Sequence, residues 1–172
     1  MLESFNSQIA SKISEESLRK YETYEHNENL QNFTKEALRL FSASSQLFPR
    51  LALKDFKLGK YSIRKGTNLN IFFNTFHHSD EVYQNCWKFE PDRFKSISEG
   101  QKKSKPAEFM PFSLGKRNCI GRYLGELFVQ SILLNFAKKF EMRALPDYEV
   151  SAVQGITYGL DSCFIRLKPR SD

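Results

Sequence analysis

The sequence predicts an α+β fold that is mainly helical. Two observations carry this prediction. Apolar residues recur at spacings of three and four in several segments, and a middle stretch instead alternates apolar with polar residues. The chain has 172 residues, which is enough for one domain with a hydrophobic core. An apolar content of 40% with 16 phenylalanines excludes a disordered linker.

The expected helices are defined by apolar stripes. One stripe runs through residues 2–13, and a second predicts a helix over residues 28–41 that has ended before Pro49. The members of the second stripe are Leu30, Phe33, Ala37 and Leu40. A long apolar helix is expected from about Ile120 to Phe140. Polar residues interrupt this segment, so it is predicted to be a buried helix and not a membrane-spanning one.

Short strands are predicted between and after these helices. Residues 54–58 and 61–63 flank a glycine and form a predicted hairpin, and the alternation of apolar residues over 69–73 predicts another strand. A short helix capped by Ser79 is expected to follow. Near the C-terminus, residues 156–160 and 163–167 are predicted to pair as a terminal hairpin.

The net charge of +6 admits a nucleic acid, an anionic membrane surface, an acidic protein or simply a solvated basic surface as its explanation. No nucleic-acid-binding motif is present, so no nucleic-acid partner is expected. The basic residues gather at Lys102, Lys103 and Lys105 and again at Lys116, Arg117 and Arg122. The three cysteines are odd in number and widely spaced without a CxxC pair, which excludes a zinc ribbon and favours a reducing compartment. No signal peptide is visible.

The segment from Phe112 to Gly121 carries the most chemical information. It places Cys119 at the entrance of a helix, where unpaired N–H groups and the helix dipole favour the thiolate, the form that binds metal. Arg117 supplies a cation for a carboxylate. Gly121 and Gly125 lie one helical turn apart and leave a flat patch without side chains. A thiolate, an arginine and a flat patch suit a haem with its propionates. A buried structural cysteine in a glycine turn is the alternative for Cys119 alone.

This segment resembles the haem-ligand loop of the cytochrome P-450 superfamily, F-x-x-G-x-R-x-C-x-G. Every fixed position matches, and the matching residues are Phe112, Gly115, Arg117, Cys119 and Gly121. Residues 36–39 resemble the E-x-x-R motif of the family, and residues 89–94 resemble its meander motif. The resemblance covers about residues 29–170 and implies the C-terminal part of the family fold, with the N-terminal helices and the oxygen-activating helix absent.

The resemblance also implies roles for single residues. Cys119 would be the axial ligand of the iron of haem b (iron protoporphyrin IX). Arg117 and Arg50 would meet propionates, and Phe112, Gly115, Gly121 and Gly125 would shape the site. Glu36, Arg39 and Arg93 would form a buried network with a structural role. His77 is similar to a family histidine near the haem edge. On an extended segment His77 and His78 would point in opposite directions, which argues against a joint metal site.

The resemblance implies monooxygenation, in which one oxygen atom of O2 enters an apolar organic substrate. An electron-donor reductase would face the basic residues Lys116 and Arg122. An endoplasmic reticulum membrane location would follow for a eukaryotic microsomal parent, although no anchor is visible in the chain. Two other readings stay open: a truncated haem-binding or inactive remnant, and a basic protein-interaction module. The chain alone is expected to be incomplete, inactive and poorly stable, with exposed apolar surface.

Overall fold

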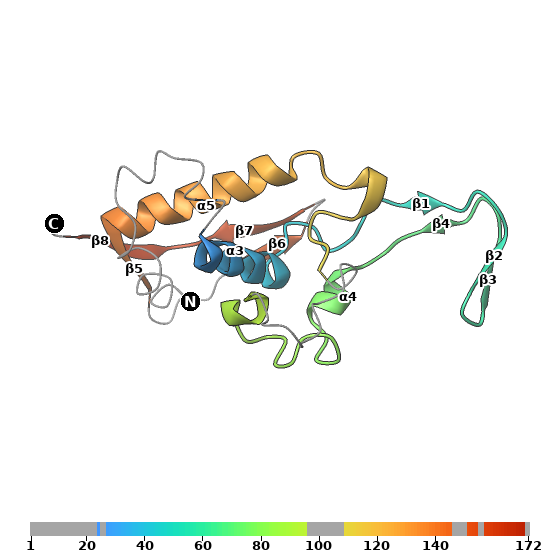
Figure 1. Cartoon of the computed structure of the whole chain (residues 1–172), viewed down its shortest axis with the longest axis horizontal. Helices are drawn as coiled ribbons and strands as arrows, with labels where there is room; N and C mark the ends of the chain where they lie inside the picture. The colour runs from blue at the N-terminus through green and yellow to red at the C-terminus, as the bar shows by residue number, and fades with distance from the viewer. Residues whose placement is uncertain (1–23, 25–26, 96–108, 146–150, 155–156, 171–172) are drawn as a thin grey trace.

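The computed structural model describes residues 24, 27–95, 109–145, 151–154 and 157–170. Within these residues, two long helices lie at the centre and four two-stranded antiparallel ribbons extend around them (Figure 1). This mixture of helices and small ribbons confirms the predicted α+β fold. The predicted helix over residues 2–13 and the lysine cluster at 102–105 lie outside the described residues.

Helix α3 (Glu28–Leu40) begins where the sequence predicts. The Asn27 side chain accepts a hydrogen bond of 3.0 Å from the Leu30 backbone N–H, which caps the first turn. At the other end, the Phe41 N–H donates to the Ala37 carbonyl at 2.8 Å, and the helix stops one residue before the predicted boundary. The face of α3 that carries the apolar stripe packs into the core.

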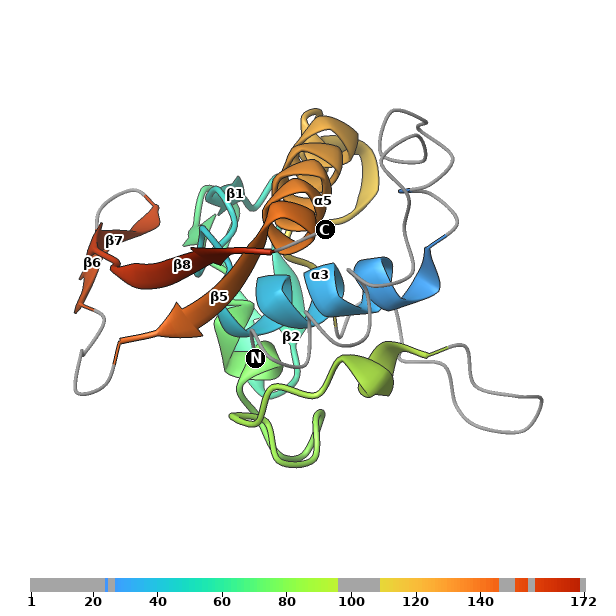
Figure 2. The same ribbon diagram turned by 90° about the vertical axis from the view of Figure 1, so that its left-hand side faces the viewer.

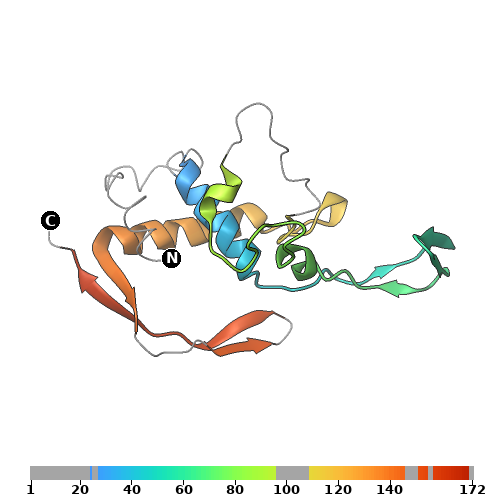
Figure 3. The ribbon, with the colours of Figure 1, turned by 90° about the horizontal axis from the view of Figure 1, so that it is seen from below.

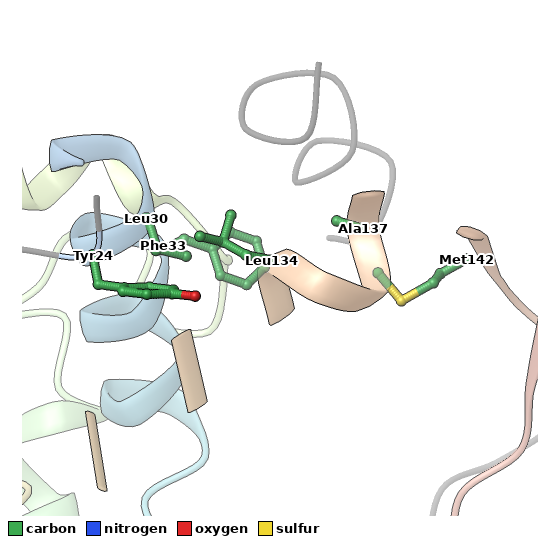
Figure 4. Packing of buried hydrophobic residues seen from close by; sticks show 6 residues of the cluster. All are labelled: Tyr24, Leu30, Phe33, Leu134, Ala137 and Met142. Atoms are coloured by element: carbon green, nitrogen blue, oxygen red, sulfur yellow. The ribbon is translucent and has the colours of Figure 1, made fainter. Parts of the chain in front are cut away.

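Helix α5 (Arg122–Lys139) packs against α3 and shares the core with it (Figure 4). The buried cluster between the helices and the following strand consists of Tyr24, Leu30, Phe33, Leu134, Ala137 and Met142. The prediction of a buried helix is wrong for the rest of α5. Leu124 is 72% exposed and Phe128 is 65% exposed, because no described segment covers this side of the helix. None of the helices in the described part of the chain has the length and apolarity that crossing a membrane requires.

The first four strands form two ribbons that extend away from the helices (Figures 1 and 3). Strand β1 (Arg50–Leu51) pairs with β4 (Asn68–Leu69), and β2 (Phe56–Leu58) pairs with β3 (Tyr61–Ile63). The second pair confirms the predicted hairpin. Its turn contains Gly59 at a φ of +57°, a left-handed conformation that glycine adopts without strain.

The strand predicted over residues 69–73 is wrong beyond Leu69, and so is the helix predicted from Ser79. The one-turn helix α4 (Asn74–His77) lies between these two segments, and residues 79–83 form a single turn. Phe73 and His77 anchor α4 in the interior, with 1% and 0% of their surface exposed. A 3-10 helix, η3 (Pro91–Phe94), packs against α3.

The C-terminal strands exist, but the predicted hairpin between residues 156–160 and 163–167 is wrong. Strand β7 (Tyr158–Ser162) pairs with β6 (Ser151–Gln154), and β8 (Ile165–Pro169) pairs with β5 (Phe140–Ala144), as Figure 2 shows. Strand β5 follows directly from α5 and places Met142 in the core. Pairing with β5 therefore places β8 next to the hydrophobic core. A local hairpin between β7 and β8 would not place it there.

The segment after β8 returns to the end of α5. The backbone N–H of Arg170 donates to the Lys139 carbonyl at 3.0 Å, and its Nε donates to the Ala137 carbonyl at 2.8 Å. Carbonyls in the last turn of a helix have no partner within the helix. Arg170 therefore completes the C-terminus of α5.

Candidate functional site

The segment that carries Cys119 is a closed loop held by backbone hydrogen bonds. The Cys119 N–H donates to the Phe112 carbonyl at 2.8 Å, and the Asn118 N–H donates to the Gly115 carbonyl at 3.1 Å across the 3-10 turn η4 (Gly115–Arg117). Gly115 has a φ of +76°, in the left-handed region where a side chain is strained. These bonds fix Cys119 at the end of the loop, where its side chain is exposed.

Helix α5 begins directly after this cysteine. The Cys119 carbonyl accepts from the Arg122 N–H at 3.3 Å, and Gly121 is the residue that precedes the first turn. The sequence placed the start of the helix near Ile120, two residues too early. Cys119 therefore stands just outside the N-terminus of α5 and not within its first turn.

The two glycines Gly121 and Gly125 lie one turn apart next to the loop. A Cβ on Gly121 would be 3.8 Å from the Cys119 Sγ, and a Cβ on Gly125 would be 3.8 Å from Cε1 of Phe112. Both distances are ordinary van der Waals contacts, so no described atom excludes a small side chain at either position. The thiol therefore lies beside Gly121, and the Phe112 ring lies beside Gly125.

Apolar side chains follow this loop along α5. Ile120, Leu124 and Phe128 follow at a spacing of four, and all three are strongly exposed; Ile120 has no described cover at all. The exposed thiol thus lies next to a run of uncovered apolar residues. Such a surface on a soluble protein marks a place that something else covers.

The basic residues predicted for the site take different places. Arg117 is exposed at the end of η4, and Arg50 is half-buried at the start of β1. Neither side chain has a hydrogen bond or ion pair with another described residue. Lys116 is exposed beside Arg117. Arg122 instead turns to Glu126, with Nε 3.1 Å from Oε1, and lines a cavity of about 290 Å³ between α3 and α5.

The predicted trio of Glu36, Arg39 and Arg93 is brought together in the interior. Arg39 approaches both carboxylate oxygens of Glu36, with Nε–Oε2 at 2.8 Å and Nη2–Oε1 at 2.9 Å, and both side chains have no exposed surface. Nε of Arg93 lies 3.0 Å from the same Oε1, which also accepts the Glu90 backbone N–H at 2.9 Å. A buried charge of either sign is stable only with such complete pairing.

Other donors of the two arginines bind backbone carbonyls of residues 77–88, and Arg93 Nη2 also lies 3.2 Å from Oε2 of Glu90. Arg39 Nη1 donates to the His77 carbonyl at 2.5 Å, and Arg93 donates to the carbonyls of Gln84 and Lys88. The cluster therefore ties α3 to residues 77–93. The sequence motifs did not reveal these carbonyl partners, because backbone groups leave no signature in the residue types.

Within the described part of the chain, the three cysteines are free thiols and no group of three or more potential metal ligands comes together. Cys86 is buried, and burial together with the neighbouring Asp80 raises the pKa of its thiol. His77 and His78 do not lie on an extended segment as expected, because both belong to the α4 turn. Burial, with smaller contributions from His78 and Arg39, lowers the pKa of His77 to about 4.

Comparison with known proteins identifies the family in which these features occur. The model of the cytochrome P-450 family matches residues 6–155. A cytokinin hydroxylase of Arabidopsis thaliana is 32% identical over 130 residues, which are 75% of this chain and 24% of the relative. The human steroid 17-alpha-hydroxylase/17,20 lyase is 27% identical over 139 residues, which are 79% of this chain and 27% of that enzyme. The crystal structure of the cytochrome P-450DA haem domain superposes with a TM-score of 0.86 at 26% identity, over 99% of this chain and 37% of that one.

The chain belongs to the cytochrome P-450 family, as the loop around Cys119 suggested. It spans about a quarter of the length of these two curated relatives.

Proposed function

We propose that this chain forms the thiolate-ligand side of a haem-thiolate monooxygenase, with Cys119 as the axial ligand of the iron of haem b. The observation that supports the proposal is the exposed Cys119 thiol, which lies beside Gly121 at the start of an uncovered apolar helix face. When bound through a thiolate, the haem supplies O–O bond cleavage and insertion of one oxygen atom into the substrate.

The residues present fit such a group. A thiolate is a suitable iron ligand, and the missing side chains of Gly121 and Gly125 would let a flat macrocycle approach the helix backbone beside it. The exposed side chains of Ile120, Leu124 and Phe128 supply apolar contact. Haem would bury these side chains, which are otherwise unfavourably exposed to water.

The other loop residues would position and shield the ligand. Phe112 holds the Cys119 N–H through its carbonyl and places its ring against Gly125. Gly115 allows the left-handed turn that brings the two ends of the loop together. Arg117 and Arg50 would bind the propionate carboxylates, and neither has a described acidic partner that competes for its guanidinium.

Glu36, Arg39 and Arg93 would have a structural role and not a catalytic one. Their donors and acceptors are engaged with one another and with backbone groups of residues 77–93. Such a cluster holds the segment that leads to the Cys119 loop. No residue of this chain is proposed as a proton donor or acceptor in the reaction.

We further propose that residues 1–172 form the C-terminal portion of a cytochrome P-450 domain, and that this portion alone binds haem without completing the reaction. The names of the two relatives denote hydroxylation of a cytokinin and of a steroid, which supports a small organic substrate. An electron-donor reductase would dock near Lys116 and Arg122, and no nucleic acid is expected. Association with the endoplasmic reticulum membrane would follow if the complete enzyme is microsomal.

Haem reconstitution of the chain tests the proposal. The reduced carbon monoxide complex is expected to show a thiolate-type spectrum that Cys119→Ala abolishes. Cys163→Ala is the matched control, since Cys163 is also an exposed thiol, and it should leave the spectrum unchanged. Absence of haem uptake by the unaltered chain would contradict the proposal and favour a basic interaction module. Haem uptake without product in the presence of a reductase is the result expected for this portion alone.

A further inference from the structure

His77 occupies a central position that the proposed function does not use. Its side chain has no exposed surface and lies among Phe73, Tyr83 and Phe109, with ring centroids 5.1, 6.5 and 5.6 Å away. Its Nε2 lies 3.2 Å from the backbone nitrogen of Met110, and its own backbone carbonyl accepts from Arg39. A single residue thus contacts both the buried ion cluster and the segment that opens the Cys119 loop.

We propose that His77 is a positioning residue for the Cys119 loop, acting as a neutral imidazole that accepts the Met110 backbone N–H through Nε2. The consequence for haem rests on the function proposed above, but the hydrogen bond itself does not. The role differs from the contact at the haem edge expected from the sequence, because His77 acts on the loop through the protein backbone.

Hydrogen bonds, joined by short stretches of backbone at Met110 and at Phe112–Ser113, connect His77 to the cysteine. Arg39 fixes the His77 carbonyl, and His77 fixes the Met110 N–H. The Met110 carbonyl then accepts from the Ser113 N–H at 3.0 Å, and the Phe112 carbonyl accepts from the Cys119 N–H at 2.8 Å. Movement of Met110 would therefore displace both ends of the turn that holds Cys119.

The geometry specifies the protonation state of the imidazole. A backbone N–H only donates, so Nε2 must accept and the ring proton must lie on Nδ1. Nδ1 has no hydrogen-bond partner among the described residues. If Nε2 carried a proton, its N–H and the Met110 N–H would face each other as two donors, and the hydrogen bond between them would break. The charged or titratable groups around the ring are Arg39 from α3, His78 from the same helix and Tyr83 from the following turn; Phe109 and Met110 contribute none.

The first test reads the tautomer in the unaltered full chain by nitrogen NMR of the three histidines. His77 is expected to be neutral with its proton on Nδ1 from pH 8 to near pH 5. A ring that carries its proton on Nε2, or that is charged at pH 6, would overturn the proposal. This measurement needs no substitution, so it does not depend on the folding of any variant.

The second test compares amide hydrogen exchange in variants of the full chain without haem. His77→Phe keeps an aromatic ring and removes the acceptor, so exchange at Met110, Ser113 and Cys119 should rise roughly tenfold, the effect of one buried hydrogen bond. Core amides such as that of Leu134 should not change. His77→Gln places an acceptor oxygen at a similar reach and should restore protection of the loop.

His78→Phe is the matched control, because His78 lies next to His77 but its Nε2 pairs with the Leu40 carbonyl. This substitution should leave the loop amides unaffected. Equal acceleration of all amides in His77→Phe, or no rescue by glutamine, would show a role in packing alone and reject the proposal. In haem-loaded samples the thiolate-type spectrum should weaken in His77→Phe and recover in His77→Gln. If the unaltered chain takes up no haem, the proposed function fails, while the exchange data still decide the role of His77.

Discussion

Arg39 and Glu36 form a two-contact ion pair one helical turn apart, with both side chains fully buried. The carboxylate also pairs with Arg93 and with a backbone N–H, so four donors surround it. Few charges in the described structure lie so far from water. Replacing a single member leaves the others buried without compensation.

Glu36→Gln is therefore expected to lower the free energy of unfolding by about 3–5 kcal/mol, because two arginines lose their counter-charge in the interior. Urea unfolding followed by circular dichroism measures this loss. Glu141→Gln is the control, since Glu141 pairs with Arg143 at the surface and an exposed pair contributes little. If the free energy of unfolding fell by a similar amount in both variants, burial of the Glu36 carboxylate would not be the cause of the loss.

Gly125 should tolerate alanine but not a large side chain. A Cβ there meets only the Phe112 ring at 3.8 Å, and alanine is favoured over glycine inside a helix by roughly 0.5–1 kcal/mol. Thermal unfolding of Gly125→Ala should thus show a small gain in stability, with haem uptake preserved. Gly125→Leu fills the area proposed for haem and should reduce haem uptake. Equal haem titration curves for the two variants would show that haem does not lie there.

Acid should destabilise the chain as the pH falls from about 6.5 to 4, because of the buried His77. The pKa of His77 is lowered from 6.5 to about 4 by burial, so between these values the unfolded chain binds the proton and the folded chain does not. The free energy of unfolding therefore falls as the pH drops from about 6.5 to 4, by roughly 3 kcal/mol for this residue. The lowered pKa of His78 acts in the same direction.

Urea unfolding at several pH values measures this dependence, and His77→Gln should remove most of it. His78→Gln should remove only a smaller part. The carboxylates of Glu90 and Glu141 also have lowered pKa values, owing to Lys88 and Arg143, and their protonation destabilises the folded chain in the same direction. A pH profile of His77→Gln that matches the unaltered chain between pH 6.5 and 4 would refute the assignment.

The three thiols should differ in reactivity. Cys119 and Cys163 are exposed, whereas Cys86 is 2% exposed and burial raises the pKa of its thiol. Because the accessible thiolate is the reactive form, iodoacetamide at neutral pH should label Cys119 and Cys163 first and Cys86 only after unfolding. Peptide mass spectrometry follows each site. Bound haem should protect Cys119 alone, and protection of Cys163 instead would argue against the proposed ligand.

Local patterns predicted those elements that depend on neighbouring residues. The extent of α3 follows from the apolar stripe, and the β2–β3 hairpin follows from the turn at Gly59. The Cys119 loop was recognised from spacing, and the structure shows the backbone bonds that close it. The residues expected to contact haem remain a proposal, as does the role of the ion cluster.

The elements that were predicted wrongly depend on contacts between residues that are distant in the sequence. Strand β8 pairs with β5 instead of β7, and no periodicity within β8 specifies which distant strand it will meet. The strand predicted over residues 69–73 ends at Leu69, and Phe73 is buried next to the helical turn α4. The exposed side of α5 was predicted to be buried because its side chains are apolar. Amino-acid composition alone does not identify the segment that would pack against them.

The bonds from Arg170 to Ala137 and Lys139 have a consequence for the order of biosynthesis. Arg170 leaves the ribosome 33 residues after Ala137, so the end of α5 lacks its final partners while the intervening strands are still being made. The Cys119 loop emerges earlier still. The C-terminal end of α5 is therefore expected to gain its last hydrogen-bond partners only after β8 has been synthesised.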